Sequence, residues 1–114
     1  MVKPLGYYTG YDPQNQSPIA LHLLVEKFGD YLQQLGISEK LALLAIISRC
    51  LAVNAQFSDK DFIYTLEDAW SETDYDIPPE LGGLLESLNE LGDGDLLGIC
   101  QTLIANHNHA EVAA

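Results

Sequence analysis

The segment from Leu41 to Ala55 is apolar on almost every side of the helix that its composition predicts. Only Ser48, Arg49 and Asn54 interrupt it. A helix with this pattern belongs at the centre of a helical bundle, because other elements must cover it all round. Its longest uninterrupted apolar run, Leu41–Ile47, is much shorter than the roughly 20 residues that span a membrane. The segment therefore predicts a core helix and no membrane association.

Apolar residues at three- and four-residue spacing predict further helices on both sides of this segment. The predicted helices run from Ser17-Pro18 to Gly36, from a cap at Ser38 to Ala55, from Ser58–Asp61 to Trp70, from Pro79 to Gly92, and from a tight turn at Asp93-Gly94-Asp95 to about residue 106. No segment alternates between polar and apolar residues as a half-buried strand would. The sequence thus predicts an all-α fold, a single compact bundle of about five helices around Leu41–Ala55.

The 114 residues are enough for one domain with its own core. We expect residues 1–114 to form a single helical domain, with residues 1–16 as an N-terminal arm and residues 107–114 as a frayed tail. The arm contains Gly, Pro and three tyrosines, Tyr7, Tyr8 and Tyr11. Their rings either cover one side of the bundle or serve an interface, and the turn-forming residues around them favour the first alternative.

Negative charge is concentrated in the second half of the chain. Residues 1–58 contain four acidic and four basic residues, whereas residues 59–114 contain thirteen acidic residues and one basic residue, Lys60. The net charge of −12 therefore arises entirely from the second half. Such a surface repels nucleic acid and attracts a basic protein surface or a cation.

The first functional hypothesis is a non-enzymatic interaction or regulatory module that binds a basic protein. Acidic residues recur at helical spacing in the third and fourth predicted helices, where like charges one turn apart are slightly destabilising. The predicted contact residues are Asp61, Asp68, Glu72, Glu86 and Glu90. The competing interpretation is that these residues only keep the protein soluble.

The alternative hypothesis is the binding of Ca²⁺ or Mg²⁺ by acidic loops that are not EF-hands. The predicted ligands are Asp74, Asp76, Asp93 and Asp95. An EF-hand loop that begins at Asp93 fails, because Leu97 and Ile104 occupy positions where oxygen ligands are needed.

Residue types that carry catalysis are scarce. Cys50 and Cys100 fall in core-like positions, where a thiol behaves as a small apolar group. His107 and His109 lie near the predicted frayed end and do not complete a zinc site with Cys100. We expect no enzymatic activity and no cofactor. The reduced cysteines and the absence of a signal-peptide pattern favour a cytoplasmic protein.

A homodimer through residues 1–35 is a further expectation. The first predicted helix has a wide apolar stripe, and the nearly neutral N-terminal halves of two copies can meet without repulsion. The competing outcome is a monomer in which the tyrosine-containing arm covers this stripe.

The stretch Leu43–Phe62 resembles part of the tellurite-resistance TerB-like domains. The resemblance covers about a sixth of the chain. The acidic glycine turn of that family is replaced here by Asn54-Ala55-Gln56-Phe57. The resemblance therefore assigns no functional residue in this sequence.

Overall fold

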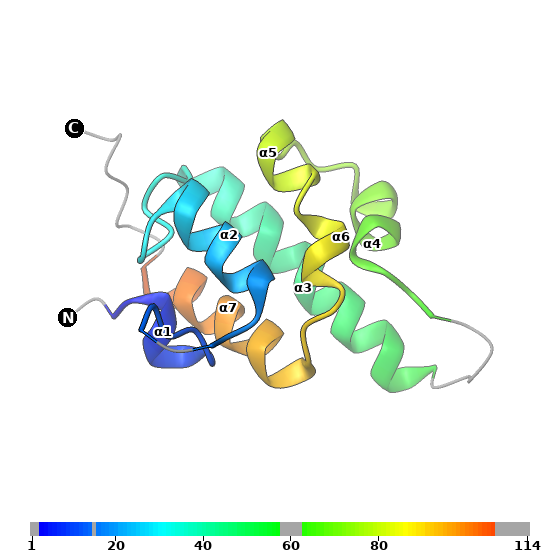
Figure 1. The fold of residues 1–114 in the computed structure, drawn as a ribbon. Coiled ribbons are helices and arrows are strands. Elements are labelled where there is room, and N and C mark those ends of the chain that lie inside the picture. Colours follow the sequence, from blue (N-terminus) through cyan, green and yellow to red (C-terminus); the bar gives the residue numbers. More distant parts are fainter. Residues whose placement is uncertain (1–2, 15, 58–62, 107–114) are drawn as a thin grey trace.

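The computed structural model describes residues 3–14, 16–57 and 63–106. These residues contain helices and connecting segments but no strand, which confirms the predicted all-α fold (Figure 1). The helices are α1 (Leu5–Tyr8), α2 (Ile19–Phe28), α3 (Ile37–Gln56), α4 (Leu66–Thr73), α5 (Pro79–Gly82), α6 (Leu85–Leu88) and α7 (Asp93–Ala105). Among the described helices, none has the length and hydropathy needed to cross a membrane.

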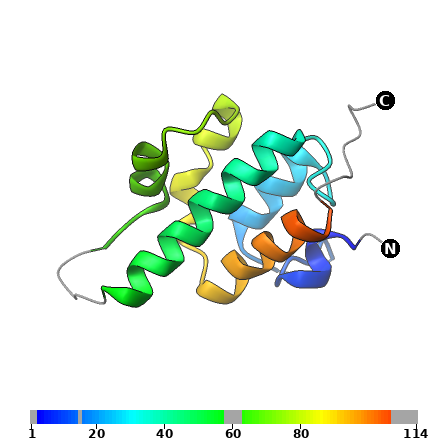
Figure 2. The same cartoon turned by 180° about the vertical axis from the view of Figure 1, so that it is seen from behind.

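The long helix α3 corresponds to the predicted central helix. It contacts α4 and α7, and Figure 2 shows it between them. It begins after Gly36 and not at the predicted Ser38 cap, because the Glu39 carboxylate accepts a hydrogen bond from the Gly36 N–H at 2.8 Å. One stripe of α3 remains uncovered, and Leu41 and Ser48 are exposed there.

The helix α2 is shorter than the apolar spacing predicted. It ends at Phe28 because Gly29 adopts a φ of +92°, a conformation that glycine tolerates and a helix does not. A loop replaces the last two predicted turns. Leu32 and Leu35 in this loop are nevertheless fully buried. The spacing therefore identified the core residues correctly but not the backbone conformation that brings them there.

The start of α2 also differs from the predicted cap. Pro18 precedes the helix, and Ile19 is its first residue. The Ser17 hydroxyl does not cap the helix and lies 2.6 Å from Nε2 of His22. The His22 ring packs edge-on against Tyr11. His22 is therefore half-buried between the arm and the rest of α2.

The helix α4 begins at Leu66. The Thr65 hydroxyl accepts a hydrogen bond from the Asp68 N–H at 3.1 Å, and the Asp68 carboxylate accepts one from the Thr65 N–H at 3.0 Å. This reciprocal pair is a capping box, which satisfies two backbone donors at the start of the helix. The predicted start at residues 58–61 lies outside the described residues, and residues 63–65 are not helical.

The fourth predicted helix is divided into α5 and α6. Pro79 opens α5 as expected, but the helix stops at Gly82, and α6 begins at Leu85. Two consecutive glycines, Gly82 and Gly83, disfavour a continuous helix at this point. A Cβ atom on Gly82 would lie only 3.1 Å from the Trp70 ring. This glycine therefore allows α5 to pack closely against α4.

The sequence Asp93-Gly94-Asp95 forms the first turn of α7 and not a separate turn before it. Gly92 is the residue at the N-cap, and no side chain caps the helix there. The two carboxylates lie near the positive end of the helix dipole, which is a favourable place for negative charge. The prediction of a tight turn at Asp93-Gly94-Asp95 before the helix is therefore wrong.

The N-terminal arm packs against α7. Leu5 is buried, and its N–H donates a hydrogen bond to the Asp30 carbonyl at 2.7 Å. At the other end of the arm, the Gly10 N–H donates to the Asp95 carboxylate at 2.8 Å. The helix α1 contacts α7, and a Cβ atom at Gly98 would lie only 2.3 Å from the Tyr8 carbonyl oxygen, so the arm and α7 pack closely there. These contacts fit the interpretation that the arm covers one side of the bundle, whereas the homodimer through residues 1–35 stays a prediction.

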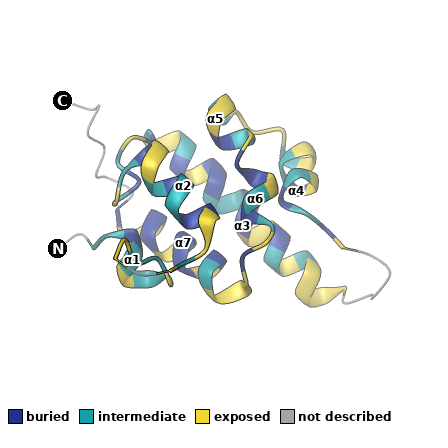
Figure 3. Ribbon diagram, in the orientation of Figure 1, coloured by how far each residue is buried: buried dark blue, intermediate teal, exposed yellow. Residues whose placement is uncertain are grey.

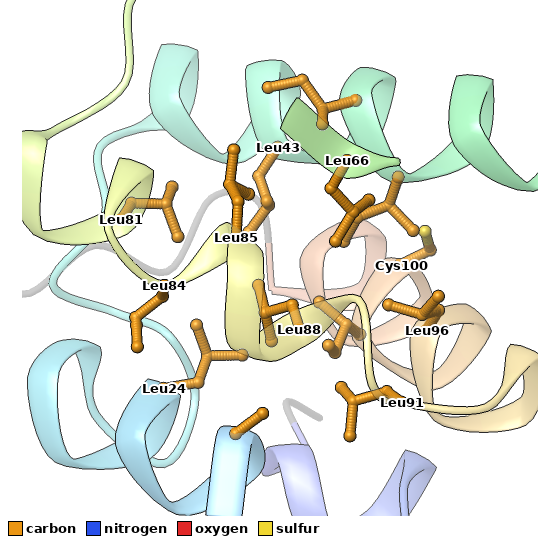
Figure 4. Close-up of a cluster of buried hydrophobic side chains, with 14 of the residues drawn as sticks. Leu24, Leu43, Leu66, Leu81, Leu84, Leu85, Leu88, Leu91, Leu96 and Cys100 are labelled. Carbon is orange, nitrogen blue, oxygen red and sulfur yellow. The ribbon is translucent and has the colours of Figure 1, made fainter. Parts of the chain in front are cut away.

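The buried side chains of these helices form one hydrophobic cluster. Buried residues face inward on α2, α3 and α7, as the dark blue parts of Figure 3 show. Leu88 of α6 lies in the middle of the cluster, with Leu24 of α2 and Leu96 of α7 near it (Figure 4). The short helix α6 is therefore positioned by leucine packing rather than by its own length.

Candidate docking surface

Asn89 joins the two acidic elements α4 and α6. Its side-chain carbonyl accepts a hydrogen bond from the Leu66 N–H at 2.9 Å, and its amide donates to the Glu67 carboxylate. The helices α4 and α6 are in contact, and Figure 1 shows them side by side. The contact brings acidic residues that are about twenty positions apart in the sequence onto neighbouring helices.

The described residues 63–106 contain no Lys or Arg. Their ten acidic residues are Glu67, Asp68, Glu72, Asp74, Asp76, Glu80, Glu86, Glu90, Asp93 and Asp95. All ten are exposed or half-exposed. Only Glu72 has a basic partner among the ion pairs of the described residues, Arg49 of α3, so the field of this region remains strongly negative.

Three of the predicted contact residues lie exposed on the joined elements. Asp68 lies on α4, Glu86 on α6 and Glu90 directly after α6. We call these three residues the acidic surface. Asp68 also closes the capping box of α4, so its carboxylate has a structural role as well. The fourth predicted contact residue, Asp61, lies outside the described residues.

Glu72, the fifth predicted contact residue, is engaged within the protein. Its carboxylate accepts hydrogen bonds from the Arg49 guanidinium at 3.0 Å and from the Tyr64 hydroxyl. The bond from Tyr64 and then the bond from Arg49 hold the pKa of Glu72 below its ordinary value. Burial raises the pKa of Tyr64, and its bond to Glu72 raises it further. Glu72 thus links α3 to α4.

We expect Glu72→Gln to lower the stability of the protein at neutral pH, with a difference from wild type that narrows below about pH 4. The folded pKa of Glu72 is depressed, so its stabilisation is present above the unfolded pKa of about 4.3 and is lost as pH falls through the folded pKa. Urea unfolding between neutral and acid pH measures the difference. The control is Glu86→Gln, which removes an exposed carboxylate from α6. A stability difference between Glu72→Gln and the wild type that stays the same at every pH would contradict the link between α3 and α4 through the Glu72 carboxylate.

Asn54 fixes the segment before α4 on α3. Its amide donates to the Tyr64 carbonyl at 2.9 Å, and its side-chain carbonyl accepts from the Tyr64 N–H at 3.2 Å. The Cys50 thiol donates to the same carbonyl at 3.3 Å. In the sequence, Asn54 stood out only as an interruption of an apolar helix. Its amide can pair with both the N–H and the C=O of one residue, and it does so with Tyr64.

Both cysteines are buried, as their positions in the apolar pattern predicted. Burial raises the pKa of Cys100 to about 11 and also raises the pKa of Cys50. Both thiols are therefore protonated at neutral pH and are poor nucleophiles. His107 and His109 lie outside the described residues.

Lys40 is a buried residue that no pattern in the sequence identified. Only 1% of it is exposed, and its Nζ donates a hydrogen bond to the Asn106 carbonyl at 2.7 Å. Burial lowers the pKa of Lys40. The ammonium group lies at the C-terminal end of α7, where positive charge is favourable. Lys40 therefore ties the start of α3 to the end of α7.

The four carboxylates of the cation hypothesis serve separate parts of the fold. Asp74 caps α4 in a left-handed conformation, and Asp76 lies on the connection to α5. Asp93 and Asp95 belong to the first turn of α7, and Asp95 also binds the arm. In the part of the chain that the structure describes, no three His, Cys, Asp or Glu residues are grouped to hold a metal ion.

Comparison of the chain with models of protein families, with curated proteins and with solved structures found no match. No residue role is taken from the short resemblance at Leu43–Phe62. The functional proposals for this chain rest on its own contacts and charges.

Proposed function

We propose that this chain is a non-enzymatic interaction module that binds a basic protein through its acidic surface. The observation that carries the proposal is the contact of α4 and α6 through Asn89, within residues 63–106, which contain no Lys or Arg. This contact sets α4, which carries Asp68, beside α6, which carries Glu86 and is followed directly by Glu90. Nucleic acid is a poor partner for such a surface, because its phosphates carry the same sign of charge.

Two physical effects support binding at Glu86 and Glu90. These residues are four positions apart, Glu86 in α6 and Glu90 directly after it, so their like charges repel each other. A basic partner relieves this repulsion when it binds. The field of the whole region also attracts that partner over a Debye length of about 8 Å at physiological ionic strength, which raises the association rate.

The test is capture of partners from native lysate at low and at high salt. We expect a basic protein that the wild type retains at low salt, that high salt releases, and that Glu86→Lys/Glu90→Lys does not retain. The matched control is Glu26→Lys/Asp30→Lys, because these two exposed residues are also four positions apart and their reversal changes the net charge equally. Recovery of no basic partner, or equal loss with both variants, would count against the proposal.

A further inference from the structure

The uncovered stripe of α3 forms one side of an apolar groove. The residues that line it are Ser38, Leu41, Ala42 and Ala45 of α3 and Tyr75 of the connection between α4 and α5. The four α3 residues lie on one face of the helix and span two turns, or roughly 10 Å along its axis. Side chains at positions 38, 42 and 45 are small, so the groove runs along α3 between Leu41 and Tyr75. We call it the Leu41 groove.

Exposed apolar residues continue on the other side of Leu41. A second hollow between α3 and α7 is lined by Lys40, Leu41, Leu44, Leu103 and Ile104. Leu41, Tyr75 and Ile104 are 51%, 49% and 59% exposed. Because Leu41 lines both hollows, these side chains form one patch along α3. Patches of adjoining apolar residues mark interaction surfaces, whereas single exposed apolar residues do not.

The charges around this patch determine which partner it fits. Tyr75 stands between Asp74 and Asp76, which are both exposed. The nearest base in the lining, Lys40, is buried, and its ammonium group binds the Asn106 carbonyl. A second copy that met this patch across a two-fold axis would place its own Asp74 and Asp76 against the same pair and be repelled, whereas a positively charged segment is attracted.

We propose that the Leu41 groove binds the apolar face of a basic amphipathic helix that belongs to the partner protein. This inference rests on the proposed function: the acidic surface attracts the partner, and the groove gives it a defined place to bind. An amphipathic helix places apolar residues at positions i, i+3, i+4 and i+7 in a hydrophobic groove. The Lys and Arg residues that border this face then lie near Asp74 and Asp76.

Two fluorescent peptides of about four helical turns test the proposal. The first contains Leu on one helical face and Lys on the other, and the second has the same composition with Leu distributed around the helix. Both peptides carry the same charge, so a difference in affinity reports the apolar face. We expect the wild type to bind the first peptide roughly tenfold more tightly.

Variants then separate the groove from the acidic surface. Leu41→Gln/Ala45→Gln is expected to weaken only the first peptide, by about tenfold, because it removes apolar contact without changing charge. Leu97→Gln is the matched control, since Leu97 is 52% exposed and lines neither hollow. Glu86→Lys/Glu90→Lys is expected to weaken both peptides alike. Unchanged thermal unfolding of each variant establishes that its fold is intact.

Each proposal has its own contradictory result. Equal affinity of the wild type for the two peptides overturns binding in the groove and leaves the acidic surface in place. Affinities that do not change in Glu86→Lys/Glu90→Lys overturn the acidic surface. Light scattering that detects a dimer of the wild type but not of Leu41→Gln/Ala45→Gln assigns the groove to a second copy of the chain and also overturns the inference.

Discussion

Leu88→Ala is expected to lower the free energy of unfolding by about 2–5 kcal/mol, because it removes a fully buried leucine from the middle of the core and leaves a cavity. The short helix α6 has few hydrogen bonds of its own, so it depends on Leu85 and Leu88 for its position. Urea unfolding monitored by circular dichroism measures the loss.

The control for this variant is Glu86→Ala in the same short helix. Glu86 is exposed, and an exposed substitution of this kind changes stability by about 0.5 kcal/mol or less. A loss below about 1 kcal/mol for Leu88→Ala would contradict the described core.

Gly98→Ala is expected to destabilise the protein by roughly 1–3 kcal/mol, although alanine favours a helix by up to about 1 kcal/mol over glycine. A Cβ atom at Gly98 would lie 2.3 Å from the Tyr8 carbonyl oxygen and 2.6 Å from Cγ2 of Thr9. The first of these neighbours is backbone, so the whole arm must move to make room. Denaturant unfolding of the variant and the wild type measures the effect.

Gly94→Ala is the matched control in the same helix. Among the described residues, no atom outside the adjoining helix backbone lies within 4 Å of a Cβ atom built at Gly94. Only the higher helix propensity of alanine therefore acts at this position. We expect this variant to be more stable than the wild type, by up to about 1 kcal/mol. A stabilising effect of both substitutions would contradict the packing of the arm on α7.

Apolar spacing in the sequence was sufficient to predict the fold class and most of the core. It identified Leu32 and Leu35 as buried, although neither is helical. The spacing could not show that Gly29 would adopt a positive φ, since a glycine is also tolerated within a helix. Periodicity reports which side chains are buried and is less informative about where a helix ends.

The negative charge of the candidate site could be predicted from the sequence, but the contacts between its residues could not. The sequence showed that the acidic residues gather in the second half, but it could not show that Arg49 engages Glu72 or that Asn89 binds α4. The partners in each of these contacts are 23 residues apart, and only the folded packing brings them together. In the sequence, Glu72 and Glu86 therefore look alike, since both are acidic residues at helical spacing. In the structure the two have different roles.

The salt dependence of association tests the acidic surface most directly. The measurement is the association rate constant of the captured basic partner with the wild type and with Glu86→Lys/Glu90→Lys, at about 50 mM and about 500 mM NaCl. We predict that salt slows association with the wild type by roughly tenfold or more, and that the variant associates slowly under both conditions with little dependence on salt. A wild-type rate constant that neither salt nor charge reversal changes would contradict binding through Asp68, Glu86 and Glu90.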